Sequence, residues 1–195
     1  MLNAQIDLET LGLESNAVIV QIGAIIYDDM DWNIVGTYGR YLSMNQQIVE
    51  GRTLTPSTVE FWKKQREDGH VTPERWEDLF NSPNPPAEVA VEFVEWFQQW
   101  EGVRIWANHL LFDVVKMDHF LSQFYQPKLS SLTKYNMIED LATLKYAVLA
   151  RDKIAGRDLI DGLYKEHKAL TQHDAVDDCI FQMHCQRAFE DFLRG

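Results

Sequence analysis

The order of apolar and polar residues divides the chain into a first part rich in strands and a longer part rich in helices. Short runs of β-branched and other apolar residues predict three strands, at residues 4–8, 17–27 and 34–43. Because only short links separate these strands, we expect them to pair as an antiparallel meander.

Beyond residue 55 most apolar residues recur at intervals of three and four, the spacing of a helix with one buried face. This spacing, with short apolar runs between, predicts helices at residues 56–67, 73–80, 87–100, 114–125, 141–150 and 174–193 and strands at 103–107 and 135–139. A meander followed by alternating helices and strands indicates an α/β fold. No linker divides the chain, so we expect residues 1–195 to form a single domain.

The composition is acidic, with a net charge of -12 and a pI near 4.8. This balance argues against a protein that coats duplex nucleic acid through bulk electrostatics. It does not exclude an enzyme with a metal-filled acidic cleft, because bound cations invert the local field. The first residues lack the pattern of a secretory signal, and the apolar stretch 17–27 is too short to span a bilayer. We therefore expect a cytoplasmic protein that does not enter membranes.

Three acidic residues in two separate segments are candidates for chemistry. Asp7 and Glu9 lie two apart in a predicted strand, so both side chains point to one face and can reach one hard cation such as Mg²⁺ or Mn²⁺. Asp113 is expected in the first turn of the helix that follows strand 103–107. Ordinary alternatives are an exposed strand edge for the first pair and a carboxylate stabilised by the helix dipole for Asp113.

A third segment contains His173 and Asp178. A step of five residues turns about 140° around a helix, so the two side chains cannot share a site if both lie within it. They can share one if His173 lies in the preceding loop and Asp174 caps the helix. The alternative is that the aspartates of this segment only cap the helix.

These segments together resemble the DnaQ-like superfamily of 3′-5′ exonucleases. Its three sequence blocks match, in the same order, Asp7-Leu8-Glu9-Thr10, Asn108 to Asp113, and His173 to Asp178. A histidine at the start of the third block resembles the DEDDh branch. The segments IDLETLG, TPSTVEFWKKQ and HDAVDDC are similar to phage exonuclease A and a related group of bacterial exoribonucleases.

The resemblance implies an RNase H-like fold, with a central five-stranded mixed sheet flanked by helices. It implies that Asp7, Glu9 and Asp178 bind two divalent ions, Mg²⁺ or Mn²⁺, with Asp7 bridging them and Asp113 helping to hold the second. It also implies that His173 is the general base on the attacking water. Two such ions can stabilise both the attacking and the leaving oxygen at phosphorus, and histidine titrates near neutrality.

The implied activity is release of nucleoside monophosphates from the 3′ end of single-stranded or 3′-overhang RNA or DNA. The candidate substrate contacts are Thr10, Leu11, Gly12, Asn108 and Trp62. Leu11 and Gly12 directly follow the first block and are candidates for wedge and backbone contacts, with an ordinary turn as the alternative. The aromatic face of Trp62 could stack on a base, but its helical neighbours favour core packing.

Two other functions remain alternatives at this point. One is a non-catalytic module that binds nucleic acid or takes part in an assembly; the intact set of acidic residues and His173 argues against it. The other is an RNase H-type endonuclease, which the histidine block fits poorly. The sequence leaves open the choice between RNA and DNA and the oligomeric state, although the many aromatic residues could form a homodimer interface.

Overall fold

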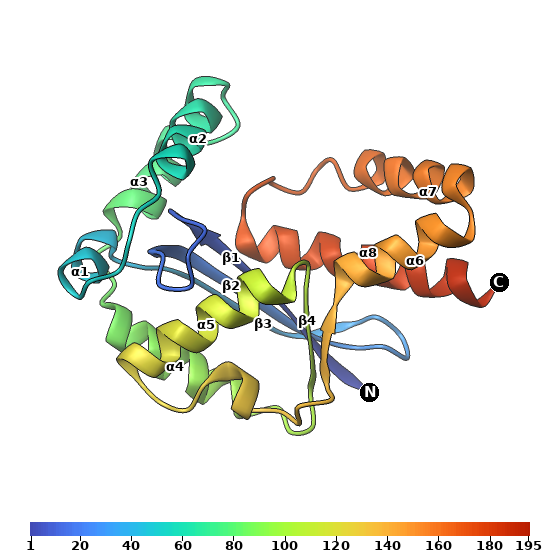
Figure 1. The fold of residues 1–195 in the computed structure, drawn as a ribbon, viewed down its shortest axis with the longest axis horizontal. Helices are drawn as coiled ribbons and strands as arrows, with labels where there is room; N and C mark the ends of the chain where they lie inside the picture. The colour runs from blue at the N-terminus through green and yellow to red at the C-terminus, as the bar shows by residue number, and fades with distance from the viewer.

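The computed structural model describes residues 1–195 and has a five-stranded sheet between layers of helices (Figure 1). The strand order is β3-β2-β1-β4-β5. β1 (Leu2–Thr10), β2 (Ile19–Asp28) and β3 (Ile34–Tyr41) form an antiparallel meander, while β4 (Arg104–Ala107) and β5 (Ile138–Asp140) run parallel to β1. The predicted meander and the predicted five-stranded mixed sheet are therefore confirmed.

Helices cover both faces of this sheet. The helix α8 (Ala175–Arg194) packs on one face of β1 and β2, whereas α4 (Pro86–Phe97) and α5 (Leu110–Phe124) pack on the other. Alternate residues of β1 divide between these layers. Ile6 and Leu8 enter the large core with α4 and α5, and Asp7 is directed to α8, where Gln182 donates a hydrogen bond to it.

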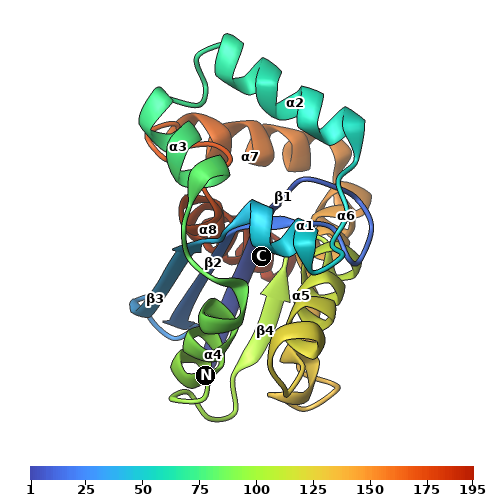
Figure 2. The same cartoon turned by 90° about the vertical axis from the view of Figure 1, so that its left-hand side faces the viewer.

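Two helical units flank the end of the sheet where β1 finishes (Figures 1 and 2). One is the hairpin of α2 (Pro56–Glu67) and α3 (Pro73–Asn81), which follows the short α1 (Met44–Val49). The other is formed by α6 (Leu141–Arg151) and α7 (Lys153–Glu166), which pack with α8 around a small apolar cluster. A short 3₁₀ turn, Leu129–Ser131, connects α5 to the strand β5. No helix of the chain combines the length and apolar character needed to cross a bilayer.

The predicted elements are present, with shifted ends and two omissions. The predicted helix 87–100 ends at Phe97, because the chain turns there toward Gly102, which has a φ of +68°. The helices α1 and α7 were not predicted. α7 contains two glycines, which lower helix propensity, but its N-cap Asp152 and its apolar residues at 159, 160 and 163 are signals that could have indicated it.

Candidate active site

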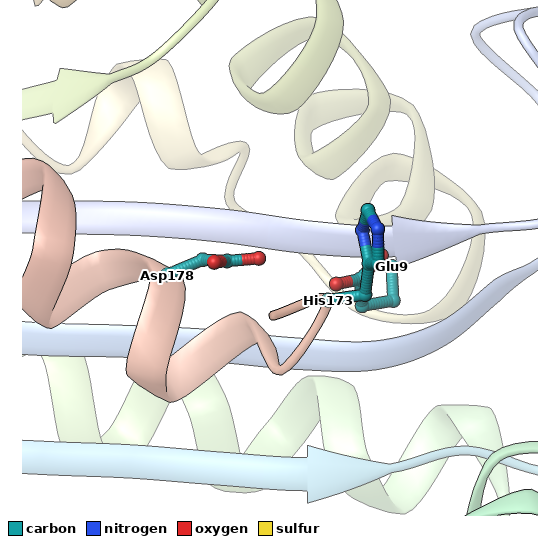
Figure 3. A group of neighbouring side chains, drawn as sticks. All are labelled: Glu9, His173 and Asp178. Atoms are coloured by element: carbon teal, nitrogen blue, oxygen red, sulfur yellow. The ribbon is translucent and has the colours of Figure 1, made fainter. Parts of the chain in front are cut away.

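The acidic residues and the histidine identified in the sequence line one hollow of about 270 Å³. They are Asp7, Glu9, Asp113, His173 and Asp178. Carboxylate or imidazole atoms of Glu9, His173 and Asp178 lie within 4.8 Å of one another, and Figure 3 shows these three side chains gathered beside the end of β1. Segments far apart in the sequence thus meet at one point.

The strand β1 and the helix α8 together fix the orientation of Asp7. The side chain of Gln5 donates to Oε1 of Gln182 at 2.6 Å, and Nε2 of Gln182 donates to Oδ1 of Asp7 at 2.8 Å. Gln182 lies one helical turn after Asp178, so it shares a face of α8 with that aspartate. A chain of amides therefore connects the two elements that carry these carboxylates.

The start of α8 separates His173 from Asp178, as the five-residue spacing required. Asp174 is the N-cap, and its Oδ1 accepts hydrogen bonds from the backbone N–H groups of Val176 and Asp177. Asp178 lies in the first turn of the helix, while His173 lies before it with a φ of +60°. The prediction that His173 belongs to the lead-in loop is confirmed.

A glycine in β2 permits the close approach of α8 to the sheet. Gly23 pairs with Asp7 in the strand register. A Cβ atom at this position would lie 2.2 Å from the carbonyl carbon of Ala175, the first residue of α8. Only the absence of a side chain lets this helix end rest on β2, which brings Asp178 beside Asp7.

Asp113 enters the site from the opposite layer. It lies in the first turn of α5, as expected, and is 3% exposed. Lys116 follows it on the same helix and is also buried; its Nζ donates to the backbone oxygen of Leu13 at 2.9 Å. This contact joins α5 to the loop that follows β1.

Burial is the largest cause of the shifted pKa values of the four carboxylates. It raises the pKa of Asp113 to about 7 and, together with the charge of Asp7, the pKa of Asp178 to about 8. Burial followed by the charge of Asp113 raises the pKa of Asp7, and burial followed by the charge of Asp7 raises that of Glu9. Ionising all four carboxylates in this small, buried space is unfavourable, because the negative charges repel one another. A bound cation would offset this repulsion.

The chemistry of these donors fits a hard divalent ion. Carboxylate oxygens are the ligands preferred by Mg²⁺ and Mn²⁺, and Glu9, His173 and Asp178 are close enough to share an ion. Burial, followed by the positive charge of Arg75, lowers the pKa of His173. Its imidazole is therefore neutral near pH 7 and free to accept a proton or to bind a metal.

Two of the predicted substrate contacts, Leu11 and Trp62, are buried away from the acidic cluster. Leu11 and Trp62 are each 1% exposed and pack in one apolar cluster under the α2–α3 hairpin. The indole N–H of Trp62 donates to the backbone oxygen of Thr10 at 3.0 Å, and the hydroxyl of Thr10 donates to the oxygen of Gly12. Trp62 has no open face for a base, so the proposed base contact is corrected to core packing, the alternative already favoured by its neighbours.

Two apolar side chains on the segments around the site are exposed, and one of them, Phe61, was considered from the sequence together with Trp62 as an aromatic surface for bases. Leu13, at 66% exposure, lies two residues beyond the buried Leu11. Phe61 is 41% exposed, and its ring meets the ring of His173 edge to face at 5.2 Å. An exposure pattern could not be read from sequence here, because it depends on how the hairpin α2–α3 packs against the loop.

A second, larger hollow of about 410 Å³ opens from the first. The two share Asp7, Asn108, His173 and Asp178, and the larger one continues between α6, α7 and α8. Lys145 and Lys168 line it and provide cations next to the acidic cluster, while Tyr164 and Phe181 provide aromatic surface. The sequence did not indicate this hollow because α7, which carries Tyr164 and forms one of its walls, was not predicted.

Solved structures with similar folds include a nuclease and several forms of exonuclease I. Cell-death related nuclease 4 superposes with a TM-score of 0.63 at 17% identity, covering 97% of this chain and 64% of that one. Exonuclease I from Methylocaldum szegediense gives a TM-score of 0.66 at 16% identity, and E. coli exonuclease I with a 5cy-dT13 oligonucleotide gives 0.67 at 18% identity; each alignment covers 97% of this chain and 40% of the other. The present chain thus spans between two fifths and two thirds of these proteins.

At such identities the structures establish the fold, which is the RNase H-like fold expected from the resemblance. No curated protein sequence matches the chain. A family profile, however, matches residues 2–189, nearly the whole chain and all three sequence blocks. The DnaQ-like resemblance is confirmed, and the chain belongs to the family described as the 3′-5′ exoribonuclease Rv2179c-like domain.

Proposed function

We propose that residues 1–195 act as one metal-dependent 3′-5′ exonuclease domain that releases nucleoside monophosphates from single-stranded or 3′-overhang RNA. The observation that carries the proposal is the hollow shared by four carboxylates and His173. The family description favours RNA. The oligonucleotides bound to E. coli exonuclease I are DNA, so DNA is the substrate to compare.

In this proposal Asp7, Glu9 and Asp178 hold two Mg²⁺ or Mn²⁺ ions, and Asp113 supports the second. The bound ions supply positive charge at the attacking and leaving oxygens of the phosphodiester. The raised pKa values of the carboxylates support this assignment, because a cation compensates the charges that the protein alone disfavours. Gln182 would keep Asp7 in orientation while the ions exchange.

The role proposed for His173 is to accept the proton of the attacking water. Its lowered pKa supports this role, since the imidazole is unprotonated at neutral pH. Its place beside Glu9 and Asp178 brings it to the proposed ions. The exposed Leu13 and Phe61 are the side chains that we propose for contact with the terminal bases, in place of Leu11 and Trp62.

The test uses matched 5′-labelled RNA and DNA oligonucleotides with Mg²⁺ or Mn²⁺. We expect a ladder that shortens from the 3′ end, faster on RNA, and that disappears with EDTA and with Asp7→Asn. The control variant is Asp158→Asn, because Asp158 is exposed on α7 and lies in neither hollow; it should keep full activity. Internal cuts would indicate an endonuclease, and no metal-dependent product would favour a non-catalytic binding module.

A further inference from the structure

Arg75 of α3 reaches across to the loop that carries His173. Its guanidinium donates to the backbone oxygen of His173 and forms an ion pair with Oδ2 of Asp174 at 3.1 Å. A weaker contact of 3.5 Å runs to Oε1 of Gln21 on β2, which itself accepts from the N–H of Ala175. One side chain thus connects the hairpin, the sheet, the lead-in loop and the cap of α8.

The conformation of His173 requires such an external support. A φ of +60° is uncommon for a residue other than glycine and persists only when its surroundings hold it. The residue before it supplies little restraint, because Gln172 is exposed. The hairpin supplies it instead: Arg75 binds the carbonyl group, and Phe61 and Trp62 pack against the imidazole ring.

The burial of Arg75 is unfavourable for stability, so its contacts with the His173 loop must offset this cost. Its side chain is only 10% exposed, and its Nε atom is buried without a hydrogen-bond partner. Desolvating a guanidinium and leaving one N–H unpaired is unfavourable. The two remaining nitrogens, however, bind the fork formed by the His173 carbonyl and the Asp174 carboxylate, a geometry that a planar guanidinium fits and an ammonium does not.

We propose that Arg75 is a positioning residue that fixes the His173 loop, so that the α2–α3 hairpin sets where the general base stands relative to Glu9 and Asp178. This inference rests on the proposed exonuclease function. It assigns a role to a residue outside the three sequence blocks. It also explains why the hairpin, which contributes no acidic residue to the site, packs against the loop.

The kinetic test compares Arg75→Ala and Arg75→Lys with the unmodified protein on the same RNA oligonucleotide. We expect kcat to fall about 10- to 100-fold in the alanine variant, the usual effect of losing an outer support, with KM changed less than about threefold. The lysine variant should lie between, since it keeps the charge but not the fork. The control is Arg157→Ala on α7, an exposed arginine with no hydrogen bond or ion pair, which should keep its kcat.

A double-mutant cycle with His173→Ala separates positioning from general damage. If Arg75 acts through His173, the double variant should be no slower than His173→Ala alone. If the two losses multiply, Arg75 does not act through His173 and the inference is overturned. Melting temperatures identify any variant that fails to fold, in which case Arg75→Lys carries the comparison.

Two readouts do not depend on activity. Mn²⁺ binding, measured by calorimetry, should survive in Arg75→Ala, because the variant keeps all four carboxylates and removes a nearby positive charge. Hydrogen exchange of the amides at residues 171–177 should accelerate in that variant and not in Arg157→Ala. An inactive unmodified protein would reject the proposed function while leaving the exchange result intact. If the unmodified protein is active but Arg75→Ala changes neither hydrogen exchange nor kcat, this inference is rejected while the proposed function stands.

Discussion

The carboxylates and the histidine of this site are held in contrasting ways. Asp7 and Glu9 lie within a central strand, and Asp113 and Asp178 lie in first turns of helices, so regular hydrogen-bonded backbone places all four. His173 lies in a loop with a left-handed backbone, and side chains from a distant hairpin hold it. The proposed metal ligands thus belong to regular elements, whereas the residue proposed to accept a proton depends on side-chain contacts from another part of the chain.

Because of this difference, the carboxylates and the histidine should respond to different substitutions. A change in the framework should disturb the proposed metal site, because the positions of the carboxylates are linked through α8 and β1. The removal of Arg75 from the hairpin should disturb the position of His173 and leave the four carboxylates in place.

The largest expected effects are the losses of kcat in Asp7→Asn and His173→Ala, and Mn²⁺ binding should distinguish the two variants. Loss of a metal carboxylate removes several kcal/mol of transition-state stabilisation, so Asp7→Asn should lose about 1000-fold in kcat together with Mn²⁺ binding. His173→Ala should lose about 100- to 10,000-fold in kcat yet bind Mn²⁺ as before. Calorimetric titration with Mn²⁺ measures the second property. Equal loss of binding in both variants would make His173 a metal ligand and erase the distinction.

The framework can be tested at Gly23. In Gly23→Ala the new methyl group would collide with the backbone of Ala175, so α8 must shift away from β2. We expect a loss of about 1–3 kcal/mol in stability by urea unfolding, with weakened Mn²⁺ binding. Gly162→Ala is the matched control, because nothing lies within 4 Å of its added methyl group in helix α7. The control should be neutral or slightly stabilising, and equal behaviour of the two variants would contradict the close packing of α8.

A smaller effect is expected from the amide that orients Asp7. Gln182→Met keeps the approximate volume but removes the hydrogen bond to Asp7, and we expect Mn²⁺ affinity to fall about tenfold. Gln186→Met is the matched control on the same helix: it loses contacts to Tyr27 and Glu190, remote from the site. Stability should fall in both variants, whereas metal affinity should fall only in the first.

The smallest effect concerns stability against pH without metal. The pKa of Asp178 is raised from 3.8 to about 8, so between these values the folded protein holds a proton that the unfolded chain has lost. Its contribution therefore falls as pH rises from about 4 to about 8. With EDTA at pH 8, Asp178→Asn should melt a few degrees above the unmodified protein, and the gap should close at pH 4.

Added Mn²⁺ should reverse that order at pH 8, because only the unmodified protein keeps the full ligand set and gains stability by binding. Thermal melts at the two pH values measure both parts. A variant that melts lower than the unmodified protein in EDTA at pH 8 would mean that the carboxylate is stabilised in the fold without a cation.

Much of the fold and the acidic cluster could be predicted because the signals are local. The period of two in β1 placed Asp7 and Glu9 on one face, and the five-residue step forced His173 off the helix that carries Asp178. The helix α7 was missed because two glycines weaken its propensity, and the hollow that it lines was missed with it. The burial of Trp62 could not be settled from the sequence in the same way. Its position in a helix does not show whether the indole ring faces the core or remains accessible to a base.

Local signals in the sequence specify which residues could bind cations and where α8 begins, because residue spacing and capping act over a few positions. The packing of distant elements specifies three further features: Gly23 admits α8 to the sheet, Leu13 rather than Leu11 is exposed, and Arg75 binds the His173 loop. These contacts join residues far apart along the chain. Their geometry depends on how whole elements pack, which no local pattern encodes.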